Sequence, residues 1–323
     1  MPKINDLPRT RARLRAVLAA CLLLAGCDRG AAPVPSNAPA QAGEPAEAAP
    51  RYLRELIFVG VLADTPVVVP FSFSGTAGDG EIMRSARAWL AHGTTWESFL
   101  DASWPSPAVG SVWQILPHPE LRVIAGGTTE IEALAFRRGE RALRLHLGAP
   151  ISEWNPGEEL RYRAMDGRLD LRGTTVRGTV FELQRIERPA TQSARGDDDW
   201  LFLTDGGSLR LLLAEATGGE AAREETFAWT YLPDGEAAWD AVEIRWLEML
   251  PFAPARRDIP IRWRYRLPGP GIEGEVWSLG YDAQVGEERA GRRAVEVRYT
   301  VEGWVSVEGE RRRVLGVIRH LQN

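Results

Sequence analysis

From residue 51 onward, apolar and polar residues alternate along short runs. In the two clearest runs, the apolar positions are each separated from the next by one charged or polar residue; they are Ile261, Trp263, Tyr265 and Leu267, and Val295, Val297, Tyr299 and Val301. A repeat of two residues is typical of an antiparallel strand with one buried face. The pattern therefore predicts half-buried β-strands in both segments.

Other segments add further strands and the turns between them. Residues 56–62 and 66–73 are rich in β-branched and aromatic side chains, which favours strands, and turn sequences such as the Asp-Gly-Gly of residues 205–207 separate such runs. Many short strands predict a sandwich or a barrel, and the roughly 270 residues after residue 50 are too many for one small barrel. We therefore predict an all-β protein with two packed antiparallel barrel or sandwich domains, residues 51–188 and residues 199–323.

One segment has helical rather than strand periodicity. Ile82, Ala86, Trp89 and Leu90 are spaced so that they would share one face of a helix. This spacing predicts a short helical insertion over about residues 80–103, broken near Gly93.

The first 26 residues have the organisation of an export signal. Five cations precede an apolar run at residues 16–24, which is too short to cross a bilayer about 30 Å thick. The Leu-Ala-Gly-Cys sequence that ends at Cys27 resembles the lipobox of bacterial lipoproteins. The resemblance implies cleavage before Cys27 and lipid attachment to its thiol, whereas an ordinary secretory signal is the alternative.

The residues that follow are consistent with a lipid anchor. Asp28 resembles the inner-membrane retention signal of enterobacterial lipoproteins, which favours the inner membrane over the outer one. Residues 27–50 are rich in Ala and Pro and have few large apolar side chains, which is typical of an extended tether. We expect a cell-envelope protein that is anchored to the membrane and faces the periplasm.

Charge narrows the classes of function. The chain has 39 Lys and Arg against 44 Asp and Glu, a formal charge of −5, and Lys3 is the one lysine. Because residues 1–26 hold five cations and one acid, their removal leaves a charge of −9 and no lysine. A chain of this charge lacks the basic stripe of nucleic-acid-binding proteins, and the lack of lysine excludes P-loop, Schiff-base and Ser-Lys chemistry.

Thiol and metal chemistry are limited as well. Cys21 leaves with the signal segment, and a lipidated Cys27 has no thiol for a disulfide or for nucleophilic attack. No metal-ligating partner at short spacing accompanies any of the four histidines, His92, His118, His146 and His320. We expect no metal and no cofactor.

Three motifs occur in order in the second half of the chain. They are Asp199-Trp-Leu-Phe-Leu-Thr-Asp-Gly-Gly-Ser-Leu209, Asp258-Ile-Pro-Ile-Arg-Trp-Arg264 followed by Gly271-Ile-Glu273, and Tyr299-Thr-Val-Glu-Gly-Trp-Val-Ser-Val-Glu-Gly309. Together, over about residues 199–320, they resemble the lipocalin-like family of attachment protein H and carotenoid hydratase (hydroxyneurosporene synthase). The resemblance implies two lipocalin-like β-barrel domains and a lipophilic ligand.

Four aromatic residues within or next to these motifs are candidates for the ligand site. Trp200, Trp263, Tyr265 and Tyr299 are predicted to line it. The alternative is that they fill the core, as large side chains in small barrels usually do.

Two acids are candidates for catalysis. Hydration of a polyene requires a buried carboxylic acid with a raised pKa, and Glu182 and Glu302 are the candidates for it. The alternative is that each pairs with a neighbouring arginine. In residues 177–185 the acid is out of register with that of the catalytic family members, and Val301 replaces the Trp of the last motif.

We therefore expect binding rather than catalysis. The prediction is a membrane-anchored lipoprotein that binds or carries a lipid or isoprenoid in the cell envelope. Its partners would be the membrane and this lipophilic small molecule, with no nucleic acid and no metal. A hydratase- or isomerase-like enzyme acting on a lipophilic polyene, and an envelope assembly lipoprotein acting through protein contacts, are the alternatives.

Overall fold

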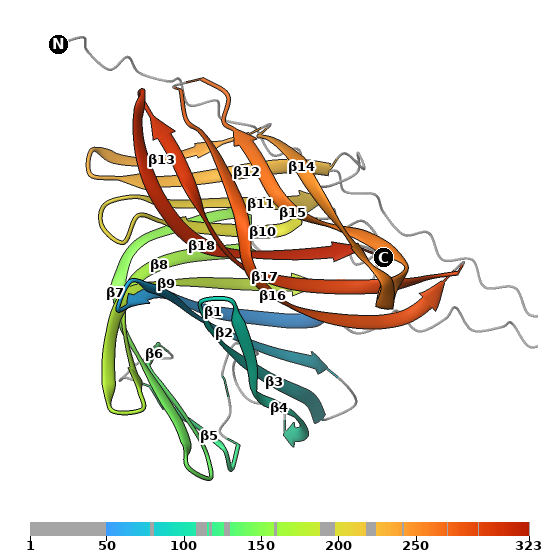
Figure 1. Ribbon diagram of the computed structural model, residues 1–323. Coiled ribbons are helices and arrows are strands. Elements are labelled where there is room, and N and C mark those ends of the chain that lie inside the picture. Colours follow the sequence, from blue (N-terminus) through green and yellow to red (C-terminus); the bar gives the residue numbers. More distant parts are fainter. Residues whose placement is uncertain are drawn as a thin grey trace, which may run out of the picture. The chain divides into compact units, whose positions relative to one another are not determined.

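Two antiparallel sheets of nine strands each make up the described part of the chain in the computed structural model (Figure 1). The described residues are 50–77, 81–107, 115, 118–125, 130–157, 160–187, 198–217, 224–240, 242–269, 271–289 and 291–322. They belong to one compact unit, residues 47–323. The expected signal segment, Cys27, Asp28, residues 29–49 of the expected tether and residues 188–197 between the expected domains lie outside them.

The two sheets have the same strand order. The first contains, from edge to edge, β4 (Thr95–Pro107), β3 (Glu81–His92), β2 (Thr65–Ala77), β1 (Arg51–Leu62), β9 (Thr174–Glu187), β8 (Leu160–Leu171), β7 (Arg141–Gly157), β6 (Ile131–Arg138) and β5 (Leu121–Ala125). The second contains β13 (Gly235–Trp239), β12 (Glu224–Leu232), β11 (Arg210–Thr217), β10 (Asp198–Thr204), β18 (Glu310–Gln322), β17 (Arg292–Val307), β16 (Glu273–Arg289), β15 (Arg257–Arg266) and β14 (Glu243–Phe252). In each sheet, the strands that come first and last along the chain pair with each other: β1 with β9, and β10 with β18. The prediction of an all-β protein is confirmed.

The predicted helical insertion over residues 80–103 is wrong. This segment contains β3 and most of β4, which pair as a hairpin, and Gly93 in their turn has a φ of +60°. Among the described residues, the helical element is one 3₁₀ turn, η1 (Ala253–Ala255).

Burial of both faces of β3 near its end explains the misleading periodicity. Ala86, Ala88 and Leu90 face the core of the first sheet, whereas Trp89 and Ala91 point to the opposite side and are also buried. A strand buried on both faces has apolar residues at consecutive positions. Such a run also contains pairs three and four residues apart, so it imitates an amphipathic helix.

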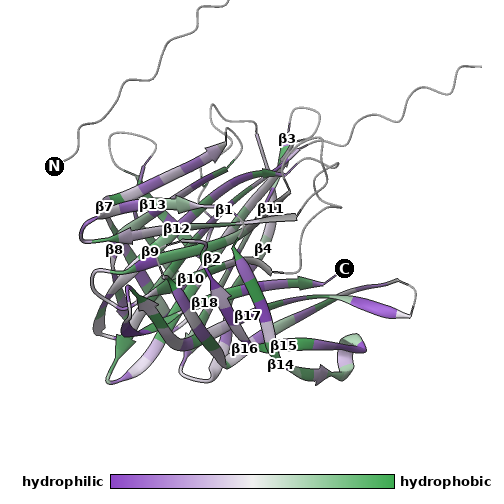
Figure 2. Ribbon diagram, turned by 90° about the horizontal axis from the view of Figure 1, so that it is seen from above, coloured by the Kyte–Doolittle hydropathy of each residue, from purple (hydrophilic) through white to green (hydrophobic). Residues whose placement is uncertain are grey.

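Each sheet buries both of its faces over its central strands. One face curls around a core within its own half, which includes Phe58, Phe71 and Phe136 in the first sheet and Val276, Val297 and Val301 in the second. The opposite faces of the two sheets pack against each other. Figure 2 shows hydrophilic and hydrophobic positions alternating along several of the strands.

An apolar centre joins the two sheets. Phe181 of β9 stacks on Phe202 of β10, with ring centroids 4.7 Å apart and an interplanar angle of 22°. Ile57 of β1 and Val317 of β18 belong to the same buried cluster. From this centre, the layer between the sheets continues to a network of buried charges in one direction and to an open cleft in the other.

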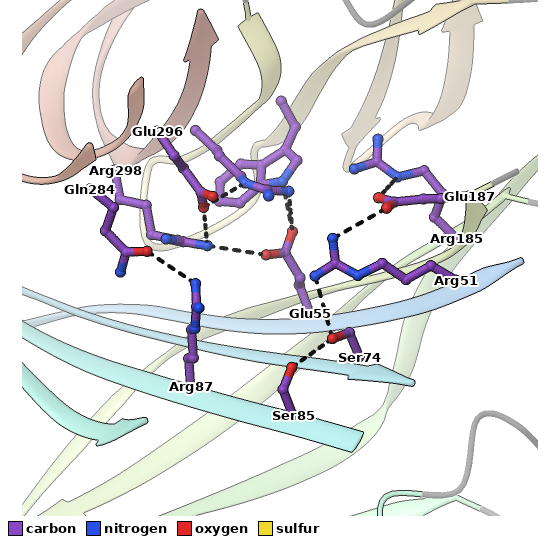
Figure 3. A network of polar contacts seen from close by, with 12 residues as sticks. Arg51, Glu55, Ser74, Ser85, Arg87, Arg185, Glu187, Gln284, Glu296 and Arg298 are labelled. Atoms are coloured by element: carbon purple, nitrogen blue, oxygen red, sulfur yellow. Dashed lines mark hydrogen bonds and ion pairs between the residues drawn. The ribbon is translucent and has the colours of Figure 1, made fainter. Parts of the chain in front are cut away.

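The charged network centres on Glu55 of β1 (Figure 3). Its carboxylate accepts a hydrogen bond from Trp200 Nε1 at 2.8 Å and lies 3.7 Å from the guanidinium nitrogens of both Arg298 and Arg319. Glu296 pairs with the same two arginines, at 2.5 and 3.0 Å. Two carboxylates therefore balance two guanidinium groups where the first sheet meets the second.

Arg298 is the most enclosed cation of this network. Its side chain is 3% exposed, and its guanidinium lies 4.0 Å from the centroid of the Trp89 ring of the first sheet. Burial lowers the pKa of Arg298, while the carboxylates of Glu296 and Glu55 oppose this shift. A buried cation of this kind is tolerated only while its counter-charges are in place.

We expect Glu55→Gln to destabilise the fold. Glutamine keeps the size of the side chain and an acceptor for Trp200, but it leaves Glu296 to balance both arginines. Removal of one member of a buried charge network should lower the free energy of unfolding by about 3 kcal/mol, measured by urea denaturation.

Glu243→Gln is the matched control. Glu243 pairs with Arg245 on β14, and both side chains are exposed, so the change should stay below about 0.5 kcal/mol. Equal effects of the two substitutions would contradict a structural role for the buried network.

Candidate functional site

A cleft of about 840 Å³ opens at the other end of the layer between the two sheets. Strands β1, β7, β8 and β9 of the first sheet form one wall, and β10, β11, β18 and the β10–β11 turn form the other. The cleft thus lies where the two sheets diverge beyond their apolar centre.

Strand register arranges the first wall in rows. Next to the apolar centre, Val59 of β1, Thr179 of β9 and Asp166 of β8 are direct neighbours. Two residues further out on the same face, Arg177 of β9 stands directly opposite Arg168 of β8. This wall therefore changes from an apolar, a hydroxyl and an acidic side chain near the floor to two cations at the rim.

A line of glycines crosses the same strands between these two rows. Gly60, Gly178 and Gly167 are neighbours on β1, β9 and β8. The ring of Phe58 covers them on the core side of the sheet, where a Cβ on Gly178 would lie 2.8 Å from this ring and 2.2 Å from the Val59 carbonyl oxygen. Glycine is required here because the Phe58 ring lies so close to the backbone.

The second wall has one continuous row. Arg210 of β11, Thr204 of β10, Leu315 of β18 and Glu302 of β17 are neighbours in register. The first three line the cleft, and Glu302 lies at its edge, where its carboxylate accepts a hydrogen bond from Arg313 Nη2 at 2.7 Å. Arg313 also lines the cleft.

Two polar contacts join the walls. Arg210 donates from Nη2 to Asp166 Oδ1 at 3.2 Å, and the hydroxyls of Thr179 and Thr204 are 3.4 Å apart. These contacts connect the first sheet to the second and therefore set the width of the cleft near its floor.

Local hydrogen bonds hold the β10–β11 turn at the mouth of the cleft. Asp205 Oδ1 accepts the backbone N–H groups of Gly207 and Leu209, at 2.8 and 2.9 Å, and Thr204 Oγ1 accepts that of Gly206 at 3.1 Å. Gly206 has a φ of +76°, a conformation that favours glycine. The Asp-Gly-Gly sequence therefore builds a turn that is fixed in place.

The cleft is locally positive in a chain of formal charge −5. Its lining residues with charged side chains are Arg168, Arg177, Arg210 and Arg313 against Asp166 and Asp205, with His146 beside them. The cationic side chains come from both sheets, so the positive charge depends on how the sheets are placed against each other.

Three of the four predicted ligand-binding aromatics lie together, inside the core of the second sheet. The rings of Trp263 and Tyr299 are 5.0 Å apart, and Trp263, Tyr265 and Tyr299 are each at most 1% exposed. Burial raises the pKa of the Tyr265 hydroxyl. Neither that hydroxyl nor Trp263 Nε1 has a hydrogen-bond partner among the residues described.

The fourth aromatic, Trp200, is elsewhere. It belongs to the inter-sheet layer, where it donates to Glu55 and packs against Phe202, with ring centroids 4.9 Å apart. The structure therefore separates Trp200 from the other three and places none of the four in the lining of the cleft.

The two candidate acids have different surroundings. Glu302 lies at the edge of the cleft, whereas Glu182 is 1% exposed within the first sheet. Glu182 accepts hydrogen bonds from Arg54 Nε and Arg163 Nε, both at 2.6 Å, and from Gln184 at 3.0 Å. Two cationic donors suit a charged carboxylate that joins strands rather than an acid that gives up a proton.

Sequence reasoning missed the arginines of the cleft. Arg168, Arg177 and Arg210 are three of 38 arginines, and no motif marks them. The Asp-Gly-Gly sequence of residues 205–207 predicts a turn, and the structure has one there. Its position at the mouth of a cleft depends on the pairing of β10 with β11 and β18.

The described residues contain no group of three or more His, Cys, Asp or Glu side chains arranged to hold a metal ion. Within the same residues, no helix has the length and apolar character needed to cross a membrane.

No family model and no curated protein sequence matches the chain. Solved structures match most of it. An AttH-like protein from Nitrosomonas europaea has a TM-score of 0.53 at 14% identity, over 89% of this chain and 98% of that one. Kievitone hydratase from Nectria haematococca has a TM-score of 0.56 at 12% identity, over 84% and 88% of the two chains. CghA has a TM-score of 0.51 at 11% identity, over 84% and 87%.

These identities are low, so the likeness establishes the fold. It is the lipocalin-like fold of the AttH and hydratase proteins, in agreement with the resemblance of the three sequence motifs.

Proposed function

We propose that the protein binds a lipophilic small molecule in the cleft between its two sheets. The observation that carries this proposal is the cleft itself, because its volume of about 840 Å³ is within the range of roughly 300–1,000 Å³ that small-molecule sites occupy. Val59, Val61, Leu147 and Leu315 supply apolar surface on both walls. The lipocalin-like fold and the resemblance to a family with lipophilic ligands support the same class of ligand.

The aromatic cluster of the second sheet is a less suitable site. Trp263, Tyr265 and Tyr299 are packed against other core residues and nearly inaccessible, so a ligand could reach them only by displacing that core. The cleft needs no such rearrangement.

We also propose that binding takes place at the cell envelope. The Leu-Ala-Gly-Cys sequence supports a lipid anchor on Cys27, and Asp28 supports retention at the inner membrane. The Ala- and Pro-rich residues 29–50 would hold the β-sheets away from the bilayer on the periplasmic side.

Hydration of a lipophilic polyene is the second candidate. Glu302 lies beside Leu315 at the edge of the cleft, and the fold is shared with a protein that is named a hydratase. In this reaction Glu302 would supply the proton. Its present hydrogen bond from Arg313 makes it an acceptor, so we rank binding first.

A tryptophan that fills the cleft should block binding. Val61 lines the cleft and is 47% exposed, so Val61→Trp should be compatible with the fold while it occupies ligand space. We expect the affinity for Nile red, a neutral lipophilic dye, to fall at least about tenfold in fluorescence titrations. Leu247→Trp, an exposed apolar position on β14, is the control; equal losses in both variants, or no dye binding by the unmodified protein, would overturn the proposal.

The hydratase candidate predicts uptake of solvent oxygen. Incubation with lycopene in H₂¹⁸O should yield a labelled alcohol by mass spectrometry, and Glu302→Gln should reduce its rate by about 100-fold or more. Glu236→Gln, an exposed acid on β13, should leave the rate unchanged. Failure of the unmodified protein to incorporate ¹⁸O would exclude this reaction on lycopene.

The anchor is tested by metabolic labelling. Cells that express the full chain with radioactive palmitate should yield a labelled protein in the membrane fraction, and Cys27→Ala should abolish the label. Cys21→Ala should retain it, because Cys21 lies within the segment that is removed. A labelled Cys27→Ala protein would refute lipid attachment at this residue.

A further inference from the structure

The rim of the cleft contains two arginines that repel each other. Arg168 and Arg177 stand directly opposite on β8 and β9 and point to the same face. Like charges in directly opposed positions of an antiparallel pair destabilise it. Arg168 has one distant acidic neighbour, Asp170 at 3.7 Å, and no ion pair joins Arg177 to any residue that the structure describes.

Arg210 adds a third cation from the opposite wall. It is 6% exposed and lines the cleft, and its guanidinium lies 5.3 Å from the centroid of the Tyr231 ring. Its Nη2 reaches Asp166, but its Nε has no acceptor among the described residues. A guanidinium with an unused N–H can donate to one more hydrogen-bond acceptor.

The acids of the cleft are already engaged. Asp205 uses Oδ1 to hold the β10–β11 turn and lies 3.7 Å from Arg312 through Oδ2. Glu302 pairs with Arg313. Asp166 pairs with Arg210, and Asp170 lies beside Arg168. Three guanidinium groups therefore face two carboxylates, and the site lacks one negative charge.

We propose that the ligand of this cleft is an amphiphile with a carboxylate head, which would supply the missing charge. The carboxylate lies among Arg168, Arg177 and Arg210, and the apolar tail lies against Val59 and Leu315 near the floor. Guanidinium groups bind carboxylates through paired, charge-assisted hydrogen bonds. This inference rests on the proposed function of the cleft and adds the chemical class of the ligand.

Two compounds that differ in the head group provide the test. Dodecanoate and dodecanol have the same tail, and each is titrated against the full-length protein loaded with Nile red. Dodecanoate should displace the dye at a concentration at least about tenfold lower, and this advantage should shrink as sodium chloride rises from low to high concentration. Acetate, which has the head group without the tail, should displace nothing.

Arg177→Gln separates recognition from folding. Arg177 is exposed and unpaired among the described residues, so its replacement should leave the urea midpoint unchanged or raise it, because repulsion of Arg168 is relieved. We expect the affinity for dodecanoate to fall about five- to tenfold, while that for dodecanol stays the same. Arg122→Gln, an exposed arginine on the edge strand β5, should change neither affinity.

The outcomes distinguish this inference from the proposed function. If dodecanol displaces the dye as well as dodecanoate does, and Arg177→Gln has no effect, the carboxylate head is refuted while lipophilic binding stands. If neither compound displaces dye from the cleft, with Val61→Trp as the blocked reference, the proposed function fails and the inference fails with it.

Discussion

The rest of the structure depends on one constraint. Each sheet has a face that its own core does not cover, and the two sheets bury these faces against each other. A curled sheet covers one face with its own core, but its central strands are apolar on the other face too, and that face must be kept from water. In this protein the other sheet covers it, with Phe181 and Phe202 stacked at the centre. The order of strands supports this arrangement, because β1, β9, β10 and β18 occupy the middle of their sheets.

The layer between the sheets is graded along the strands. At the end where β1 begins, Glu55 and Glu296 neutralise Arg298 and Arg319, whose side chains are 3% and 5% exposed. Such a network contributes little net stability, since the charges lose their hydration, but loss of one member leaves a buried charge unbalanced. It joins charged side chains of both sheets at this end of the layer.

The cleft lies at the opposite end of the same layer. Where β1 ends, the apolar contacts stop, and the β10–β11 turn and the start of β18 face β8 and β9 across an open space. The walls meet through Asp166 and Arg210 and through two threonine hydroxyls. Cations of both sheets converge there because register, and not sequence proximity, makes Arg168 and Arg177 neighbours.

Local sequence was enough to predict the fold class and several strands and turns, because alternation with period two and Gly-rich turns depend on neighbouring residues only. The three motifs of the second half also led to the correct fold. Sequence could not reveal that β3 is a strand, since burial of both faces near its end places apolar residues at consecutive positions. Nor could it assign Trp200 to the inter-sheet layer, Trp263 to a core and Glu182 to a pair of arginines, because strand register and sheet packing decide which face and which partners a side chain meets. The cleft depends on both sheets at once, so only the tertiary structure could produce it.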